Sequence, residues 1–295
     1  MSLSRFSGPF HQSHLMDYET CPRMFYFRHV RQLAPEYTSA AQFIGQSVHA
    51  TIQDIHAHRL NTPGSIRSVF LDHCRTHKEE TAKLNGSLRW DGDPKEVLDE
   101  AVQYLTCYAS KPQNQEANIL FAEHEWECEI GKYAFAGRID QVREVNGKLI
   151  LIDFKTSAYR PHEEFLRRSY QLSLYAYALW KTIGRIPDAI WHYQLKDHLI
   201  YRRSGSWGKI GDERGPAIYV THRTEADLRY LETDVARLCA AIRFGLHFRR
   251  PANLGACNGF CRYTQTCLGE IESPLLSPST IHLLEEVLSH ELVTI

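Results

Sequence analysis

The chain has 295 residues, 43% of them hydrophobic, and carries 34 Lys and Arg against 35 Asp and Glu, for a formal net charge of −1. This composition suits a sizeable core and excludes a largely disordered chain, while the near-zero charge leaves any attraction to nucleic acid to local basic patches. The chain contains no run of about 18 apolar residues, so no membrane span is predicted, and the first residues lack the apolar segment of a secretion signal. We therefore expect a cytoplasmic protein that does not contact a membrane.

Hydrophobic periodicity divides the chain into three parts. In chain order, helices are expected over 13–33, 42–60, 65–85 and 94–111, strands over 119–129, 132–145 and 148–155, a helix over 162–184, strands over 188–195 and 217–222, and helices over 223–248 and 277–291. We predict a helical N-terminal segment (1–115), an α/β core (116–250) and a cysteine-rich C-terminal closure (251–295) that form one compact unit.

A tight hairpin is predicted around the Asn-Gly pair at 146–147. Asn-Gly between two strand-like runs favours a two-residue type I′ turn, which pairs Val145 with Lys148. Counting outward along this ladder places Asp140 opposite Asp153. Two opposed carboxylates would repel each other unless a cation lies between them, and hard divalent cations prefer oxygen ligands. The alternative is a partly exposed hairpin whose acids point into water.

The second of these strands ends in LIDFKTSA (150–157), where Asp153 and Lys155 occupy alternate positions. Residues two apart in a strand share a face, so a carboxylate and an ammonium group should lie side by side. The pair could be a surface salt bridge or the working edge of an enzyme. Gly137, in AGRID, is expected to mark a bulge or a close approach of another backbone, with a simple kink of the sheet as the alternative.

Three helical residues could complete such a site. His49 shares a helix face with Gln53 and His56, and could supply a nitrogen ligand or remain an ordinary surface histidine. Gln171 and Tyr175 lie one helical turn apart and could hydrogen-bond a substrate or be satisfied internally.

Three of the eight cysteines crowd into CNGFCRYTQTC (257–267), a spacing that suggests metal ligation. Four other cysteines are expected to act as small buried hydrophobic residues, namely Cys74, Cys107, Cys128 and Cys239.

Taken in order, these pieces resemble the PD-(D/E)xK nuclease superfamily in its RecB-type branch, which includes the nuclease domains of RecB and AddB and the CRISPR-associated RecB-like exonucleases. The matching residues are His49 in GQSVH, Asp140 in GRID, Asp153 and Lys155 in DFKT, Gln171 and Tyr175 in YQLSLY, Cys21 in CPRMFYF, and Cys257, Cys261 and Cys267. The resemblance implies a restriction-endonuclease-like core, in which helices flank a central mixed sheet, with an iron–sulfur closure at the C-terminus.

The resemblance also implies roles for these residues. The side chains of His49, Asp140 and Asp153 and the backbone carbonyl of Phe154 would bind Mg²⁺ or Mn²⁺. Lys155 would orient the attacking water or stabilise charge on the phosphate.

By the same resemblance, Gln171 and Tyr175 would contact the substrate strand. Cys21, Cys257, Cys261 and Cys267 would hold a [4Fe–4S] cluster, although the spacing here is C-x3-C-x5-C where the family usually has C-x2-C-x5-C. Four thiolates also fit Zn²⁺, so a zinc site is the alternative.

The function implied is a metal-dependent deoxyribonuclease, an exonuclease acting on DNA ends or single strands in repair, recombination, phage DNA processing or CRISPR DNA processing. The chain has no G-x-x-x-x-G-K-[ST] motif, so a helicase or a recombination or CRISPR protein could be its partner. Two alternatives are a catalytically inactive nucleic-acid-binding protein and a zinc-stabilised scaffold.

Overall fold

The structure is a computed structural model that describes residues 6–83, 88–90, 92–157, 160–196, 199–201, 207–209, 217–250, 257 and 261–269. The helix predicted over 277–291 lies outside the described residues. The helices are α1 (Gln12–Thr20), α2 (Pro22–Phe25), the π-helix η1 (Tyr26–Val30), α3 (Ala40–His58), α4 (Pro63–Lys83), α5 (Pro94–Ser110), α6 (Pro112–Gln115), α7 (Glu163–Arg168), α8 (Tyr170–Ile183), α9 (Glu225–Phe244) and α10 (Thr264–Gly269).

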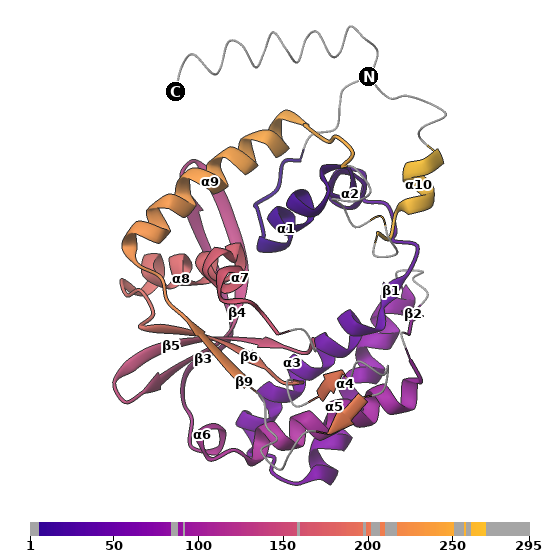
Figure 1. The fold of residues 1–295 in the computed structure, drawn as a ribbon, viewed down its shortest axis with the longest axis vertical. Helices are drawn as coiled ribbons and strands as arrows, with labels where there is room; N and C mark the ends of the chain where they lie inside the picture. The colour runs from indigo at the N-terminus through magenta and orange to yellow at the C-terminus, as the bar shows by residue number, and fades with distance from the viewer. Residues whose placement is uncertain are drawn as a thin grey trace, which may run out of the picture.

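One five-stranded sheet organises the fold, with strand order β3-β4-β5-β6-β9. Its strands are β3 (Asn118–Ile130), β4 (Tyr133–Val145), β5 (Lys148–Lys155), β6 (Ala189–Gln194) and β9 (Ala217–Thr221). β5 and β6 run parallel, whereas the other neighbours are antiparallel, so the sheet is mixed. With helices on both faces, this is the predicted α/β, restriction-endonuclease-like core (Figure 1).

Two short strand pairs were not predicted. They are β1 (Thr38–Ser39) with β2 (Leu88–Arg89), and β7 (Leu199–Tyr201) with β8 (Trp207–Lys209). Each strand has only two or three residues, which is too short for a hydrophobic pattern to reveal.

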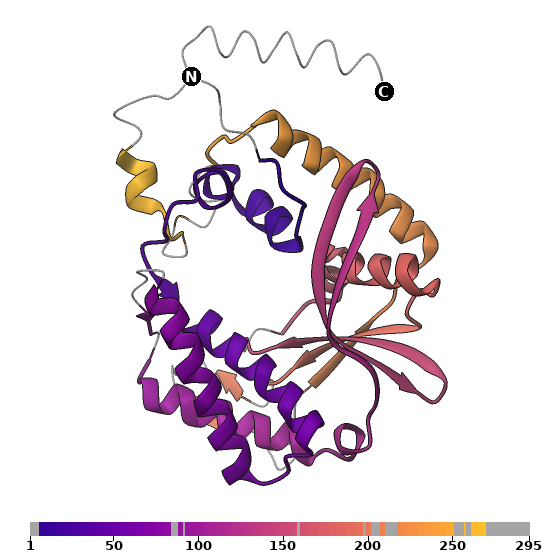
Figure 2. The same cartoon turned by 180° about the vertical axis from the view of Figure 1, so that it is seen from behind.

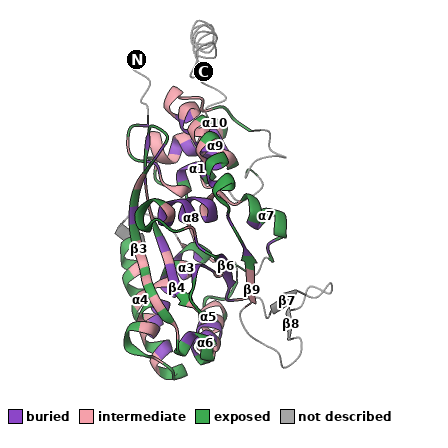
Figure 3. Ribbon diagram, turned by 90° about the vertical axis from the view of Figure 1, so that its left-hand side faces the viewer, coloured by how far each residue is buried: buried purple, intermediate pink, exposed green. Residues whose placement is uncertain are grey.

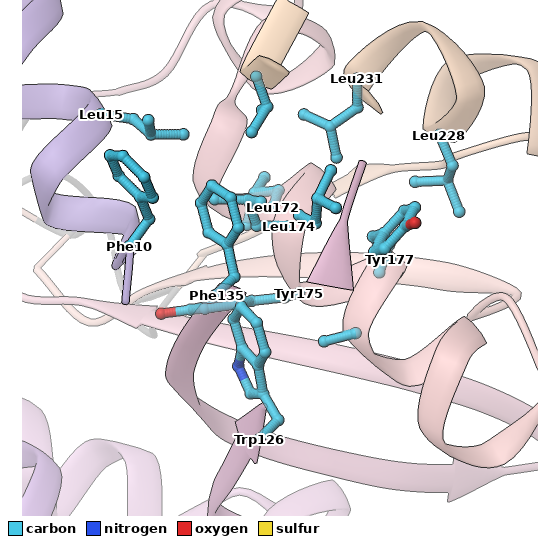
Figure 4. Packing of buried hydrophobic residues seen from close by; sticks show 14 of the residues in the cluster. Phe10, Leu15, Trp126, Phe135, Leu172, Leu174, Tyr175, Tyr177, Leu228 and Leu231 are labelled. Atoms are coloured by element: carbon cyan, nitrogen blue, oxygen red, sulfur yellow. The ribbon is translucent and has the colours of Figure 1, made fainter. Parts of the chain in front are cut away.

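The central strand β5 is buried on both faces and separates two hydrophobic cores. Leu149 and Leu151 pack into a core with α1, α8 and α9, while Ile150, Ile152 and Phe154 pack into a second core with α3, α4 and α5. Figure 2 shows these helical groups on opposite sides of the sheet. The first core is drawn in Figure 4, where side chains of α1, α8 and α9 converge above the sheet. A strand covered on both faces explains the continuous apolar run LILI.

The predicted hairpin is confirmed. Asn146 and Gly147 have φ values of 52° and 74°, as a type I′ turn requires. The ladder then runs from Val145–Lys148 to Gln141–Ile152, which is the predicted register.

Two of the predicted helices are interrupted at points that matter for the site. The helix expected over 13–33 breaks at Cys21, whose extended backbone (φ −163°) separates α1 from α2. The helix expected over 162–184 breaks at Ser169, which caps α8 by accepting a hydrogen bond from the Leu172 amide. A side chain that can cap a helix competes with helix continuation, which explains the break.

The cysteine-bearing closure packs against the N-terminal segment. Tyr263 is buried, contacts the ring of Phe27 and donates a hydrogen bond to the Leu33 carbonyl at 3.2 Å. Arg262 donates to the Gln42 side chain at 3.0 Å. The two ends of the described chain therefore meet, and α10 lies beside α2 (Figure 1).

Within the described residues, none of the helices combines the length and apolar content that a membrane crossing requires.

Gly137 is where a side chain, and not another backbone, approaches the sheet. It lies opposite Trp126 in the β3–β4 ladder, and a Cβ atom added to it would stand 2.6 Å from Cζ2 of the buried Trp126 ring. We expect Gly137→Ala to lower the free energy of unfolding by about 1–3 kcal/mol, because the indole must shift within a packed core. Urea denaturation measures this loss.

The matched control for that variant is Gly64→Ala in α4, where an added Cβ meets nothing within 4 Å. It should be neutral or slightly stabilising. Equal stability of the Gly137→Ala and Gly64→Ala variants would show that the Trp126 ring does not restrict this position.

Candidate active site

The end of β5 carries a buried ion pair. Asp153 is fully buried, and its Oδ1 accepts a hydrogen bond from Lys155 Nζ at 2.7 Å. Its other oxygen, Oδ2, is buried without a hydrogen-bond partner among the described residues, although His192 Nδ1 of β6 lies 3.3 Å away. The sequence-predicted pairing of Asp153 with Lys155 on one face is confirmed, and the second carboxylate oxygen faces the His192 ring.

Both members of this pair are ionised. Burial opposes the charge of Asp153, but the ammonium group of Lys155 and the nearby His192 outweigh it, so the pKa of Asp153 lies below its ordinary value. Burial likewise opposes the charge of Lys155, but Asp153 and Asp140 raise the Lys155 pKa above its ordinary value. Lys155 is therefore a fixed cation at neutral pH and cannot act there as a base.

Gln171 and Tyr175 extend this pair onto α8. Lys155 Nζ donates to Gln171 Oε1 at 3.1 Å, and Gln171 Nε2 donates to the Tyr175 hydroxyl at 3.0 Å. Burial and the surrounding carboxylates raise the pKa of Tyr175, which stays protonated. The structure thus brings both predicted residues to the site, where they hold the ammonium group in place.

Beside this pair lies a second cluster, formed by His49 of α3, Glu123 of β3 and Asp140 of β4. One donor atom from each lies within 4.8 Å of the others, and this is the one such group of three among the described residues. His49 Nδ1 is 3.6 Å from Asp140 Oδ1 and 3.8 Å from Glu123 Oε1. The packing of Val48 and Ile52 against the sheet holds α3 so that His49 reaches these carboxylates.

The predicted opposition of Asp140 and Asp153 needs correction. The described β4–β5 ladder ends one pair earlier, at Gln141–Ile152, and the Phe154 amide instead donates to Asp140 Oδ2 at 2.8 Å. The two acids therefore meet at a strand end, joined through a backbone amide, and not as a regular cross-strand pair.

Asp140 faces a different acid, Glu123, which sequence reasoning missed. The pairs Ala122–Gln141 and His124–Ile139 flank these two residues, so they are opposed in the β3–β4 ladder. Glu123 has a φ of 46°, a left-handed conformation that is uncommon and strained for glutamate. Arg138 Nε holds its other oxygen, Oε2, at 2.8 Å.

The register of the β3–β4 hairpin could have revealed Glu123, since the same counting that paired the other strands applies to it. His192 was also missed, and no comparable signal existed for it. It lies on a strand parallel to β5, joined through α7 and α8, and the register of such a pair cannot be counted from a turn.

Not every histidine on the predicted face of α3 reaches the site. His56 Nε2 contacts the Tyr108 hydroxyl at 2.7 Å, and Tyr108 in turn accepts a hydrogen bond from buried Arg143. Burial and the charge of Arg143 lower the pKa of His56 to about 4. His56 is therefore neutral and belongs to a polar network between α3, α5 and β4, and Gln53 is exposed to solvent.

The donor set fits a divalent cation that prefers oxygen. His49, Glu123 and Asp140 offer one nitrogen and two carboxylate groups, and Asp153 adds the unpartnered buried oxygen Oδ2. Carboxylate-rich sites with one imidazole suit Mg²⁺ or Mn²⁺.

The four candidate cluster cysteines lie at the junction of the two chain ends. Burial raises the pKa of Cys261, and the neighbouring Cys257 and Cys21 thiols raise it further, so these three lie near one another. Cys267 lies in α10, where its amide donates to the Tyr263 carbonyl. No three of these thiols approach within 4.8 Å of each other, a statement that covers all four because each is described.

Metal binding at the cluster of His49, Glu123 and Asp140 should release a proton from His49. Burial opposes its charge, but the two adjacent carboxylates raise the pKa of His49 to about 10, so the ring is protonated near neutral pH. A histidine ligand must be neutral, so a cation competes with that proton and binds more tightly as pH rises toward this pKa. We expect the Kd for Mn²⁺ to fall about tenfold per pH unit between about pH 7 and pH 9.

Calorimetry in buffers of different ionisation enthalpy counts the released proton directly. His49→Gln should remove most of the pH slope, whereas His58→Gln on the exposed end of α3 should keep it. An Mn²⁺ affinity of the unaltered protein that does not change with pH would contradict the ligand role of His49.

Comparisons with known proteins identify the fold family. A model of the PD-(D/E)XK nuclease superfamily matches residues 9–268. The chain is similar in fold to a crystal structure of a candidate exonuclease from Eubacterium rectale, at 12% identity and a TM-score of 0.52, with 88% of each chain covered. It is also similar to the crystal structure of SSO0001, at 14% identity and a TM-score of 0.34, covering 87% of this chain and 93% of that one. No curated protein matches the chain. Because the family match spans most of its length, the chain belongs to the PD-(D/E)XK nuclease superfamily.

Proposed function

We propose that the protein is a metal-dependent deoxyribonuclease of the RecB-type branch, an exonuclease that hydrolyses phosphodiester bonds at DNA ends or in single strands. The observation that carries this proposal is the buried pair of Asp153 and Lys155, which lies next to the cluster of His49, Glu123 and Asp140 because the Phe154 amide donates to Asp140. A scaffold with ordinary surface acids would have no reason to bury such a group, because an uncompensated buried charge is strongly destabilising.

Four side chains would hold Mg²⁺ or Mn²⁺, namely His49, Glu123, Asp140 and Asp153, with the Phe154 carbonyl as a further oxygen. When bound, such a cation neutralises charge on the phosphoryl group and lowers the pKa of a water. Without it, the protonated His49 and Arg138 balance the carboxylates of Glu123 and Asp140. His49 gives up its proton when the cation takes over this role.

In addition to the proposed metal ion, Lys155 supplies a positive charge at the site. Its raised pKa keeps it protonated, so we assign it to donating hydrogen bonds to the scissile phosphate or to the attacking water. Gln171 fixes the direction of the ammonium group through Oε1, and Tyr175 fixes Gln171. Within this network the Tyr175 hydroxyl only accepts and Gln171 Nε2 uses one of its two N–H groups, so both residues keep a donor for the substrate strand.

We further propose that Cys21, Cys257, Cys261 and Cys267 hold a [4Fe–4S] cluster that stabilises the meeting of the two chain ends. Four thiolates around one Zn²⁺, each about 2.3 Å from the ion, would lie roughly 3.8 Å apart. The resemblance to the RecB-type branch favours the iron–sulfur cluster over a single zinc ion. With that closure, residues 1–115, 116–250 and 251–295 would form one compact unit.

The route of DNA to the site, and any helicase, recombination or CRISPR partner, belong to the same proposal. A chain with no nucleotide-binding loop of its own needs another protein, or an already open end, to deliver single strands. Repair, recombination, phage DNA processing and CRISPR DNA processing all offer such ends.

Removing either charge of the buried pair should abolish cleavage. Lys155→Met and Asp153→Asn are each expected to lower the rate of Mn²⁺-dependent hydrolysis of a labelled single-stranded DNA by at least about 100-fold, because each removes stabilisation specific to the transition state. Lys148→Met, which removes an exposed lysine at the hairpin, serves as the matched control and should retain full activity.

Circular dichroism checks that the variants fold. Full activity of a folded Lys155→Met variant would refute the role given to Lys155. If the unaltered protein, with its cysteine site filled, binds DNA but cuts neither ends nor single strands, the non-catalytic nucleic-acid-binding function replaces the nuclease.

The cysteine site makes a separate prediction. Anaerobically purified protein should be brown, absorb broadly near ~400 nm and contain about four iron atoms per chain. Cys257→Ser should lose this absorbance and lower the melting temperature, whereas Cys107→Ser should keep both. About one zinc and no iron per chain would overturn the cluster in favour of the zinc alternative, without touching the nuclease proposal.

A further inference from the structure

A cavity of about 1020 Å³ opens beside the catalytic residues, between α1 and the α7–α8 corner. Asp153, Lys155 and Gln171 form part of its wall, and Met16 of α1 and Phe165 of α7 form another part. Its volume is at the upper end of the range for small-ligand pockets, so it can hold more than the reacting phosphate.

Phe165 is the unexpected part of this wall. It is 57% exposed, while its neighbour Leu166 is only 3% exposed and anchors α7 in the core. Figure 3 shows α7 as an exposed helix beside the buried α8. Met16, on the α1 side of the same cavity, is 46% exposed. Packing of the folded chain therefore does not account for a large apolar ring at this position.

The short helix α7 is held firmly enough to present that ring. The buried Arg223 donates from Nη2 to the Leu166 carbonyl at 2.7 Å and from Nε to the Ser173 hydroxyl at 2.7 Å. It thereby joins the C-terminal end of α7 to the first turn of α8, across the break at Ser169. Residues on both sides of the break line the cavity, among them Phe165 and Arg168 of α7 and Gln171 of α8.

Three cationic side chains that line the cavity are suited to binding a phosphate backbone. The exposed side chains of Arg168 and Arg250 line the cavity together with Lys155. Glu19 and Glu164 also line it, and Arg250 acts on Glu19 electrostatically. The cavity thus combines a face for stacking with separated positive charges, which is the arrangement that binds unpaired nucleotides with little regard to sequence.

We propose that Phe165 stacks on an unpaired base next to the scissile phosphate, and that this cavity makes the site selective for single-stranded nucleic acid. The inference rests on the proposed nuclease function and adds the feature that selects the substrate. A base inside a duplex is paired and stacked on its neighbours, so it cannot offer its face to Phe165. A single strand with its phosphate at Lys155 can turn a base toward α7.

The first test compares binding of a labelled single-stranded oligonucleotide with binding of a blunt-ended duplex, with Ca²⁺ replacing Mn²⁺ so that the DNA is held but not cut. Phe165→Ala should raise the Kd for the single strand about 5- to 150-fold and leave the duplex unchanged, since stacking on one aromatic side chain contributes on the order of 1–3 kcal/mol. Phe165→Trp should restore binding.

Phe248→Ala is the matched control. Phe248 is 58% exposed, as much as Phe165, but does not line the cavity. The Phe248→Ala variant should bind both the single strand and the duplex as the unaltered protein does. The Mn²⁺ affinity of Phe165→Ala should also be unchanged, because Phe165 is not among the proposed ligands.

The second test removes the base from the DNA, instead of the Phe165 ring from the protein. Oligonucleotides with one abasic nucleotide, placed at successive positions, should show one position at which the unaltered protein loses affinity and Phe165→Ala loses nothing further. Such non-additivity identifies the stacked base. A single-strand RNA of the same sequence shows whether the sugar matters.

Additive losses at every position, or equal loss of single-strand and duplex binding, would overturn the stacking proposal. Unchanged single-strand binding by Phe165→Ala would do the same while leaving the nuclease intact. An unaltered protein that cuts no DNA would instead refute the nuclease function, so the two failures are distinguishable.

Discussion

The buried ion pair of Asp153 and Lys155 is the interaction on which the rest of the site depends. Burying two charges is costly unless their geometry is favourable and their remaining lone pairs and protons are satisfied. Lys155 meets that condition through Gln171, whereas Asp153 keeps one oxygen unpartnered. Hydrophobic cores on both faces of β5 stabilise the strand that carries this pair.

The elements around that pair each contribute one kind of group. Strands β3 and β4 supply opposed carboxylates, α3 supplies an imidazole across the sheet edge, and α8 supplies the amide that directs the lysine. The strained backbone of Glu123 and the separation of β4 from β5 occur at the same level of the sheet. At this level Asp140 lies opposite Glu123, and its Oδ2 accepts a hydrogen bond from the Phe154 amide in place of a regular cross-strand pairing with Asp153.

Several of these features could be predicted from the sequence because they depend on local rules. The Asn146–Gly147 turn needs two positive φ values, so its register follows from counting, and the alternation of Asp153 and Lys155 follows from the strand period. The same rules mislead where the chain stops being regular. The ladder ends before Asp140, and the helix over 162–184 breaks at Ser169, since capping by a serine competes with helix continuation without a strong sequence signal.

The sequence by itself determined the mixed α/β character, the hairpin, the residues of the D-x-K strand end and the family to which the chain belongs. Only the tertiary structure decided that Glu123 joins His49 and Asp140, that His192 approaches Asp153, and that His56 turns instead to Tyr108. The physical reason is the range of the interactions. Turn geometry and strand period act over a few residues, whereas contacts between α3, β3 and β6 depend on how separate elements pack, and packing is set by the whole core.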